Sequence, residues 1–125
     1  SFHYMDSGID TGRIILQKEI TIKEEDTAYS LYHKLIGVFS SNFCEAFDLL
    51  MAGYNGMEQK GLSSYYSRKL PYEGKREIKD LNLEDAWRFV RAMYFPPYKG
   101  AVFILKDGSR VEVNSIESLH QYMEV

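Results

Sequence analysis

A single long apolar stripe constrains the fold of this chain more than any other feature. From residue 28 to residue 50, apolar side chains recur every three or four positions, the spacing that gathers them on one face of an α-helix. The stripe consists of Ala28, Leu31, Tyr32, Leu35, Phe39, Phe43, Ala46, Phe47 and Leu50. Thr27 can cap the start of such a helix, and Gly53 can end it. We therefore predict one long helix with its apolar face in a core, a possible bend at the short polar residues 40–42, and a buried thiol at Cys44.

Two short β-rich runs precede this helix. Residues 2–5 and 13–20 are rich in β-forming residues, and the segment between them contains glycines and small polar residues that favour a tight loop. A strand, a loop and a second strand are therefore predicted. Because β-rich sequence begins at residue 2 with no initiator methionine before it, we expect the chain to be part of a longer protein.

The second half of the chain is predicted to be a small structure of its own. Residues 55–82 lose all periodicity and are predicted to form an irregular connection. Asn82 can cap a short helix over residues 83–94. An Asp-Gly step between the β-rich runs 101–105 and 110–113 is typical of a β-hairpin.

A last helical turn is predicted over residues 116–123, with Asn114 or Ser115 as its cap. The elements together predict a mixed α/β class, or α+β when the chain is taken alone. We divide the chain into residues 1–54, the connection, and residues 83–125.

Composition and charge argue against several classes of function. The 125 residues are 45% hydrophobic and 26% charged, as in an ordinary globular domain with a core. The net charge of −3 disfavours binding to a nucleic-acid backbone. No apolar run reaches the roughly 20 residues that span a bilayer, so we expect a cytoplasmic protein without a membrane partner. His3, His33 and His120 are widely separated in the sequence, and we predict no metal site.

The most informative segment is residues 3–17, which read His-Tyr-Met-Asp-Ser-Gly-Ile-Asp-Thr-Gly-Arg-Ile-Ile-Leu-Gln. A histidine, an acidic loop, an Asp-x-Gly step and an apolar strand ending in glutamine occur in this order in the formyltransferases that use 10-formyltetrahydrofolate. The chain resembles this family, with further similar landmarks at residues 20–35, at Gln59, at residues 66–69 and at residues 89–97. The likeness covers most of the chain and is most specific in residues 3–17.

The resemblance implies a fold and a reaction. The fold would be the C-terminal edge of a Rossmann-like formyltransferase sheet plus the long helix, followed by a short helix and a terminal hairpin. Residues 1–54 would be the C-terminal portion of the catalytic domain, and residues 83–125 a small C-terminal subdomain. In the family, a substrate amine attacks the formyl carbon of 10-formyltetrahydrofolate, which requires an acid/base group and a donor for the developing oxyanion.

Asp10 matches the aspartate of the family that orients a catalytic histidine and helps to move the proton. The loop before it matches the backbone stretch that faces the pterin ring of the folate. That loop consists of Asp6, Ser7, Gly8 and Ile9. The Asn-x-His motif of the family is missing from these 125 residues, and His3 matches a different histidine, which we expect in a core or supporting place. The chain alone is therefore predicted to be inactive, with the N-terminal Rossmann half of the same protein as its partner.

Two acceptor amines fit the family, a nucleotide-linked amino sugar and the methionine of initiator tRNA. The segment after Pro97 is too short for the basic barrel of the tRNA enzymes, so we prefer the sugar N-formyltransferases and place methionyl-tRNA formyltransferase second. Purine-pathway formyltransferases usually end soon after the long helix, so the segment that follows the helix in this chain counts against them. The residues predicted to bind the substrate are Gln59, Tyr66, Arg68 and Lys69. The terminal hairpin is predicted to form a homodimer, as in the sugar enzymes.

Two other classes of function stay open. The triplet Asp10-Thr11-Gly12 also occurs in retroviral-type aspartic proteases, but those subunits are nearly all β, whereas a long helix is predicted here. Taken alone, such a triplet in a loop is usually a turn. A non-catalytic interaction module, with the ten tyrosines and the hairpin as an interface, is the other alternative.

Overall fold

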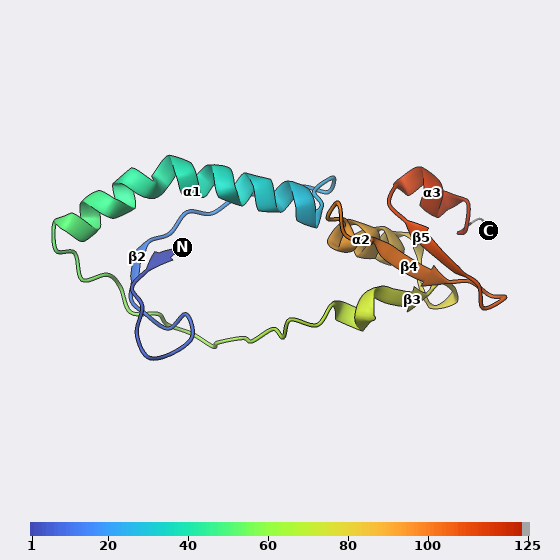
Figure 1. Ribbon diagram of the computed structural model, residues 1–125, viewed down its shortest axis with the longest axis horizontal. Coiled ribbons are helices and arrows are strands. Elements are labelled where there is room, and N and C mark those ends of the chain that lie inside the picture. Colours follow the sequence, from blue (N-terminus) through green and yellow to red (C-terminus); the bar gives the residue numbers. More distant parts are fainter. Residues whose placement is uncertain (124–125) are drawn as a thin grey trace. The chain divides into compact units, whose positions relative to one another are not determined.

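The computed structural model describes residues 1–123, so residues 124–125 at the end of the predicted C-terminal subdomain lie outside the described residues. The chain forms two compact units. The first unit comprises residues 1–21 and 33–66, and the second comprises residues 22–32 and the chain from residue 67 onward. Figure 1 labels most of the helices and strands. The mixture of small sheets and helices confirms the predicted α/β class.

A two-stranded antiparallel ribbon opens the first unit. Strand β1 (Phe2–His3) pairs with β2 (Ile14–Leu16), with Phe2 opposite Leu16 and His3 opposite Ile14. Both strands are shorter than the predicted runs 2–5 and 13–20. The reason is geometric, because the pairing partner of Leu16 is residue 2 and later residues have almost no chain opposite them.

Helix α1 (Ala28–Met51) starts with a reciprocal cap. The Thr27 hydroxyl accepts a hydrogen bond from the Ser30 N–H at 3.0 Å, and the Ser30 hydroxyl accepts one from the Thr27 N–H at 2.9 Å. The carboxylate of Asp26 is buried just before the helix and accepts a hydrogen bond from the Lys23 N–H at 2.8 Å. The predicted cap at Thr27 is therefore confirmed.

The helix ends at the predicted glycine. Gly53 has φ +77°, and the Tyr54 N–H donates to the Leu49 carbonyl at 3.1 Å, the arrangement of a Schellman motif. No break occurs at residues 40–42. The side chains of Ser41 and Asn42 donate to carbonyl oxygens four residues earlier, so they are satisfied within an intact helix.

The apolar face of α1 is only partly covered. Phe2 stacks on Phe39 with ring centroids 4.9 Å apart, and Ala46 is buried. Phe39, Phe43 and Phe47 are nevertheless 52%, 50% and 47% exposed. The prediction that this face lies in a core is wrong for the described residues, because only two short strands oppose it. Cys44 is also exposed, since it lies about 100° around the helix from Phe43.

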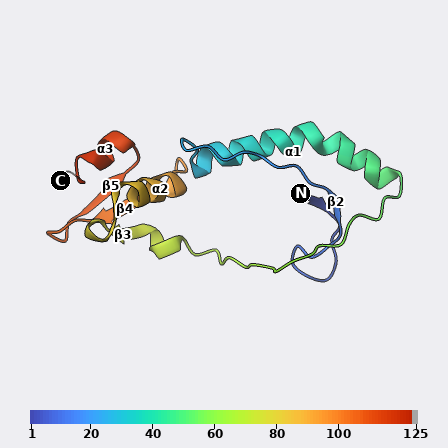
Figure 2. The ribbon, with the colours of Figure 1, turned by 180° about the vertical axis from the view of Figure 1, so that it is seen from behind.

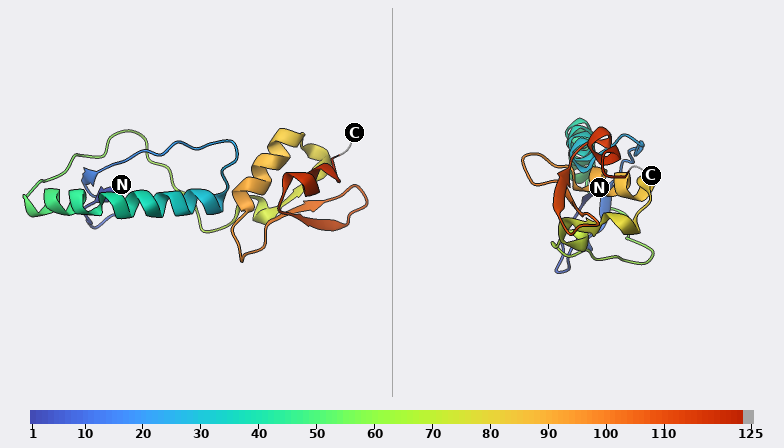
Figure 3. Two further views of the ribbon diagram at one scale, coloured as in Figure 1. Left: turned by 90° about the horizontal axis from the view of Figure 1, so that it is seen from above. Right: turned by 90° about the vertical axis from the view of Figure 1, so that its right-hand side faces the viewer.

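The second unit is a three-stranded sheet with helices, shown from behind in Figure 2 and from above in Figure 3. Its elements are η1 (Pro71–Gly74), β3 (Lys75–Glu77), η2 (Ile78–Asp80), α2 (Leu83–Met93), β4 (Ala101–Ile104), β5 (Arg110–Val113) and α3 (Ile116–His120). Strand β4 lies in the middle, parallel to β3 and antiparallel to β5. The sequence pattern did not indicate β3, because its strand character comes from pairing with a distant segment.

The predicted cap of the short helix and the predicted hairpin are confirmed for this unit. The Asn82 side chain caps α2 by accepting from the Asp85 N–H at 2.8 Å, and the β4–β5 hairpin turns at Gly108. Ser115, rather than Asn114, caps α3, and α3 ends earlier than the predicted residue 123. Both helices pack on one core, whose largest fully buried side chains are Phe103, Leu119, Val90 and Val113.

Candidate active site

The loop between β1 and β2 carries Asp10. The loop comprises residues 5–12 and connects β1 to β2. Tyr4 and Arg13 form the neck of the loop, where the Tyr4 N–H donates a hydrogen bond of 2.9 Å to the Arg13 carbonyl. A Cβ atom on Gly12 would lie 1.7 Å from the Tyr4 carbonyl oxygen. Only glycine therefore allows the two sides of the neck to approach this closely.

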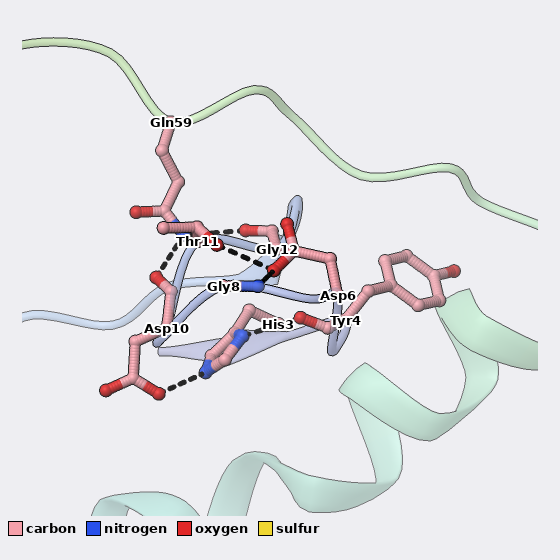
Figure 4. Close-up of polar contacts among 8 residues, drawn as sticks. All are labelled: His3, Tyr4, Asp6, Gly8, Asp10, Thr11, Gly12 and Gln59. Carbon is pink, nitrogen blue, oxygen red and sulfur yellow. Dashed lines mark hydrogen bonds and ion pairs between the residues drawn. The ribbon is translucent and has the colours of Figure 1, made fainter.

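Asp6 holds the loop from the inside. One of its carboxylate oxygens accepts hydrogen bonds from the Thr11 hydroxyl at 2.6 Å and from the Gly8 N–H at 2.9 Å (Figure 4). The Thr11 hydroxyl first, and the Gly8 N–H second, keep the pKa of the Asp6 carboxyl below its ordinary value. The ionised side chain is thus a structural part of the loop.

Asp10 points outward from the same loop. Its side chain is 85% exposed, and its backbone has φ +52°, a left-handed conformation that is unfavourable for a residue with a Cβ atom. Its carboxylate faces His3, whose Nε2 lies 3.6 Å from Asp10 Oδ1. His3 Nδ1 donates to the Tyr4 carbonyl at 2.7 Å, which orients the ring, and the contact with Asp10 is attractive when the ring is protonated (Figure 4).

Gln59 approaches the loop from the other side. Its Nε2 donates to the carbonyl oxygen of Asp10 at 2.8 Å and to that of Gly12 at 2.6 Å. Figure 4 shows the amide between the two carbonyls, on a segment that passes beside the loop. Gln59 lies 49 positions after Asp10 and 47 positions after Gly12 in the sequence, and these two hydrogen bonds join it to the loop at the candidate catalytic aspartate.

An open groove of about 720 Å³ lies beside the neck of the loop. It is lined by Tyr4, Asp6, Gly12, Arg13, Gly53 and Asn55. Neither Asp10 nor His3 lines this groove, whereas both line a smaller hollow of about 130 Å³ at the loop. The arrangement therefore offers an accessible carboxylate beside an oriented imidazole, with the larger groove on the Asp6 and Arg13 side of the loop. A carboxylate in this position can orient an imidazole or accept a proton.

The other residues predicted from the sequence lie in two places. Ser7, Gly8 and Ile9 are exposed in the loop beside Asp10. Tyr66, Arg68 and Lys69 are exposed on an extended segment, and their role in substrate binding stays a prediction.

Part of the aromatic and basic segment around residues 65–76 serves packing in the second unit. The guanidinium of Arg76 lies 4.4 Å from the centroid of the Tyr72 ring, and Tyr72 contacts Phe89 edge to face. These two residues therefore contribute a cation–π contact and a core contact of that unit.

Two roles were missed by sequence reasoning. His3 was expected in a core or supporting place, but the direct approach to Asp10 was not predicted. Gln59 was expected to contact substrate, but its amide nitrogen bonds the loop backbone. No local signal reveals either contact, because each depends on how the loop folds back across β1 and β2.

Within residues 1–123, no group of three or more histidine, cysteine, aspartate or glutamate side chains is arranged to hold a metal ion. In the same part of the chain, every helix is too short or too polar to cross a membrane.

Comparison with known proteins bears on this site. The family model described as formyl transferase matches residues 1–46, which include the loop, Asp10 and most of α1. A GDP-perosamine N-formyltransferase from Brucella melitensis is 39% identical over 123 residues, which cover 98% of this chain and 47% of that protein. A methionyl-tRNA formyltransferase from Francisella tularensis is 32% identical over 120 residues, covering 94% of this chain and 36% of that protein.

A solved structure also matches. A 4-N formyltransferase from Francisella tularensis superposes with a TM-score of 0.76 at 24% identity, over 90% of this chain and 48% of that chain, which shows a common fold. The chain spans about half the length, or less, of the proteins it matches. The resemblance to formyltransferases inferred from residues 3–17 is confirmed, with a sugar N-formyltransferase ahead of a methionyl-tRNA formyltransferase in identity.

Proposed function

We propose that this chain is the C-terminal part of a formyltransferase that moves a formyl group from 10-formyltetrahydrofolate to a primary amine, with Asp10 as the catalytic aspartate. The observation that carries the proposal is the setting of Asp10. Its carboxylate is exposed, lies 3.6 Å from an oriented imidazole, and falls inside the segment that matches the formyl transferase family. A carboxylate in this setting can take up the proton that an attacking amine releases, or orient the catalytic imidazole that the N-terminal half of the protein would supply.

The loop suits the folate donor in its chemistry. Because the Asp6 carboxylate is used inside the loop, the exposed main chain of Ser7, Gly8 and Ile9 would meet the polar edge of a pterin ring. When bound, 10-formyltetrahydrofolate would supply an electrophilic formyl carbon on a nitrogen leaving group. Such a transfer also needs an acid/base group and an oxyanion donor, and we propose that the N-terminal Rossmann half of the same protein provides them.

We propose a nucleotide-linked amino sugar as the acceptor. The relative that is named for GDP-perosamine is 39% identical to this chain over 123 residues, against 32% over 120 residues for the methionyl-tRNA formyltransferase. The net charge of −3 provides little attraction for tRNA, which keeps methionyl-tRNA as the second candidate. Tyr66, Arg68 and Lys69 are proposed to contact the nucleotide, because arginine binds phosphate in a fork and tyrosine can stack on a base.

The organisation of the whole protein follows from this proposal. Residues 1–54 would complete a catalytic domain, residues 55–82 would connect it, and residues 83–125 would form a C-terminal subdomain. The β4–β5 hairpin is proposed as the contact of a cytoplasmic homodimer. A non-catalytic interaction module remains the alternative of another class, whereas the long helix α1 argues against a nearly all-β protease.

The substrate class can be tested with the longer protein that contains this chain. Purified protein would be incubated with 10-formyltetrahydrofolate and, separately, with nucleotide-linked 4-amino sugars, nucleotide-linked 3-amino sugars and charged initiator tRNA, and products would be identified by mass spectrometry. We expect formylation of an amino sugar. Turnover with tRNA and with no sugar would reverse the order of the two candidates, and no turnover with any acceptor would refute the proposed activity.

The role of Asp10 is tested by Asp10→Asn in the same protein. We expect kcat to fall by roughly a hundredfold or more, because positioned acid/base groups contribute about 10²–10⁴-fold to such reactions. Asp80→Asn, at an exposed aspartate of the second unit, is the matched control and should leave kcat unchanged. Equal activity of Asp10→Asn and wild type would remove Asp10 from the mechanism.

A further inference from the structure

We infer that Gln59 is a positioning residue that clamps the backbone of the Asp10 loop through its amide nitrogen. This inference rests on the proposed function, since it assigns a role toward the catalytic aspartate. It revises the expectation from the sequence that Gln59 binds the substrate.

The amide nitrogen of Gln59 is fully occupied. A glutamine amide carries two hydrogens, and here Nε2 donates to the Asp10 carbonyl at 2.8 Å and to the Gly12 carbonyl at 2.6 Å. These two carbonyls flank Thr11. The side chain therefore bonds both ends of the short segment that begins at Asp10 and has no amide hydrogen left to donate to a ligand.

Asp10 receives support from outside its own loop. Its φ of +52° lies in the left-handed region, which aspartate tolerates better than most residues with a Cβ atom but which still costs free energy that neighbouring groups can offset. The hydrogen bonds within the loop run from the Gly8 N–H and the Thr11 hydroxyl to the Asp6 carboxylate, so they do not include Asp10. The hydrogen bond from Gln59 is made to the carbonyl oxygen of Asp10 itself, and it restrains the backbone of the residue that carries the catalytic carboxylate.

The segment that delivers Gln59 is locked to β2. Met57 and Ile14 exchange two backbone hydrogen bonds, each of 2.8 Å. Nε and Nη2 of Arg13 donate to the carbonyl oxygens of Asn55 and Gly56, each at 2.9 Å. Because residues 55–57 are held in this way, the position of Gln59 two residues later is set by the same strand that continues from the Asp10 loop.

The clamp requires an amide and not merely a side chain of that size. Gln59→Leu keeps the length but removes both donors. Gln59→Glu places carboxylate oxygens against two carbonyl oxygens, which repel them. Gln121→Leu is the matched control, because it makes the same chemical change at an exposed glutamine of the second unit.

The first measurement uses NMR on the longer protein that contains this chain, with isotope labels on aspartate, threonine and glycine. The resonances of the Asp10 carboxyl carbon and of the Thr11 and Gly12 amides would be compared in wild type, Gln59→Leu, Gln59→Glu and Gln121→Leu. We expect both Gln59 variants to move the resonances of residues 10–12 and the Gln121 variant to leave them in place. Unmoved resonances in the Gln59 variants would overturn the clamp, whatever the activity of the protein.

The second measurement uses formyl transfer by the longer protein. A misplaced aspartate should lower kcat by roughly ten- to a hundredfold in Gln59→Leu, with KM for donor and acceptor within about twofold of wild type. A raised KM at unchanged kcat would instead make Gln59 a substrate contact and overturn the inference. If wild-type protein transfers no formyl group at all, the proposed function fails, and the NMR comparison still decides whether Gln59 clamps the loop.

Discussion

Asp6 and Asp10 stand in the same loop but use their carboxylates in different ways. The Asp6 carboxylate accepts two hydrogen bonds from within the loop, whereas the Asp10 carboxylate is exposed and faces His3. The sequence motif marks both acids as site residues, because both lie between the same two β-rich runs. Their different uses depend on the direction of each side chain in the folded loop, where the backbone is left-handed at Asp10 and the Asp6 carboxylate is bonded to Gly8 and Thr11.

The role of Asp6 predicts a dependence of the loop on pH. Since the Thr11 and Gly8 hydrogen bonds lower its pKa, the ionised form stabilises the folded loop. This stabilisation is present above the ordinary value of 3.8 and is lost as the pH falls through the lower pKa of the folded state. The Gly8 amide resonance should therefore titrate with a midpoint below 3.8 in wild type and stay constant with pH in Asp6→Asn. A midpoint above that value would contradict the role given to Asp6.

At the scale of elements, the ends of α1 and α2 were predictable and the covering of their faces was not. The caps at Thr27 and Asn82 and the stop at Gly53 follow from side chains within a few residues of each helix end. In contrast, the exposure of Phe43 and the existence of β3 depend on segments that are distant in the sequence. Helix ends can therefore be predicted from nearby residues, whereas the covering of a helix face and the pairing of a short strand cannot.

One glycine inside the long helix and one just after its end make a matched test of this local chemistry. Gly37 is in the helix interior with nothing within 4 Å of where a Cβ would be, so Gly37→Ala should raise the free energy of unfolding by about 0.5–1 kcal/mol. Gly53 has φ +77°, so Gly53→Ala should lower it by roughly 1–2 kcal/mol. Urea unfolding of the 125-residue chain, followed by circular dichroism, measures both. The same sign for both substitutions would contradict the assignment of the helix end.

At the scale of the molecule, the two units differ in how their apolar surface is covered. The second unit closes its own core around Phe103 and Leu119, which are fully buried. In the first unit, Phe39, Phe43 and Phe47 remain about half exposed along a groove of about 380 Å³ beside Phe2 and Ile15. A row of half-exposed aromatic rings on one helix face is typical of a surface that another part of a protein covers.

This difference predicts where the 125-residue chain presents apolar surface. A dye that fluoresces on apolar surfaces, such as ANS, should bind the folded chain, and Phe43→Gln should reduce that binding strongly because it interrupts the row of rings. Tyr98→Gln, at an exposed aromatic residue of the second unit, should change it little. Coexpression with the N-terminal half of the proposed formyltransferase should yield a one-to-one complex with low dye binding, since that half would cover the face of α1. Equal dye binding by Phe43→Gln and wild type, or a complex that leaves the dye signal unchanged, would show that this face is not the surface on which the rest of the protein packs.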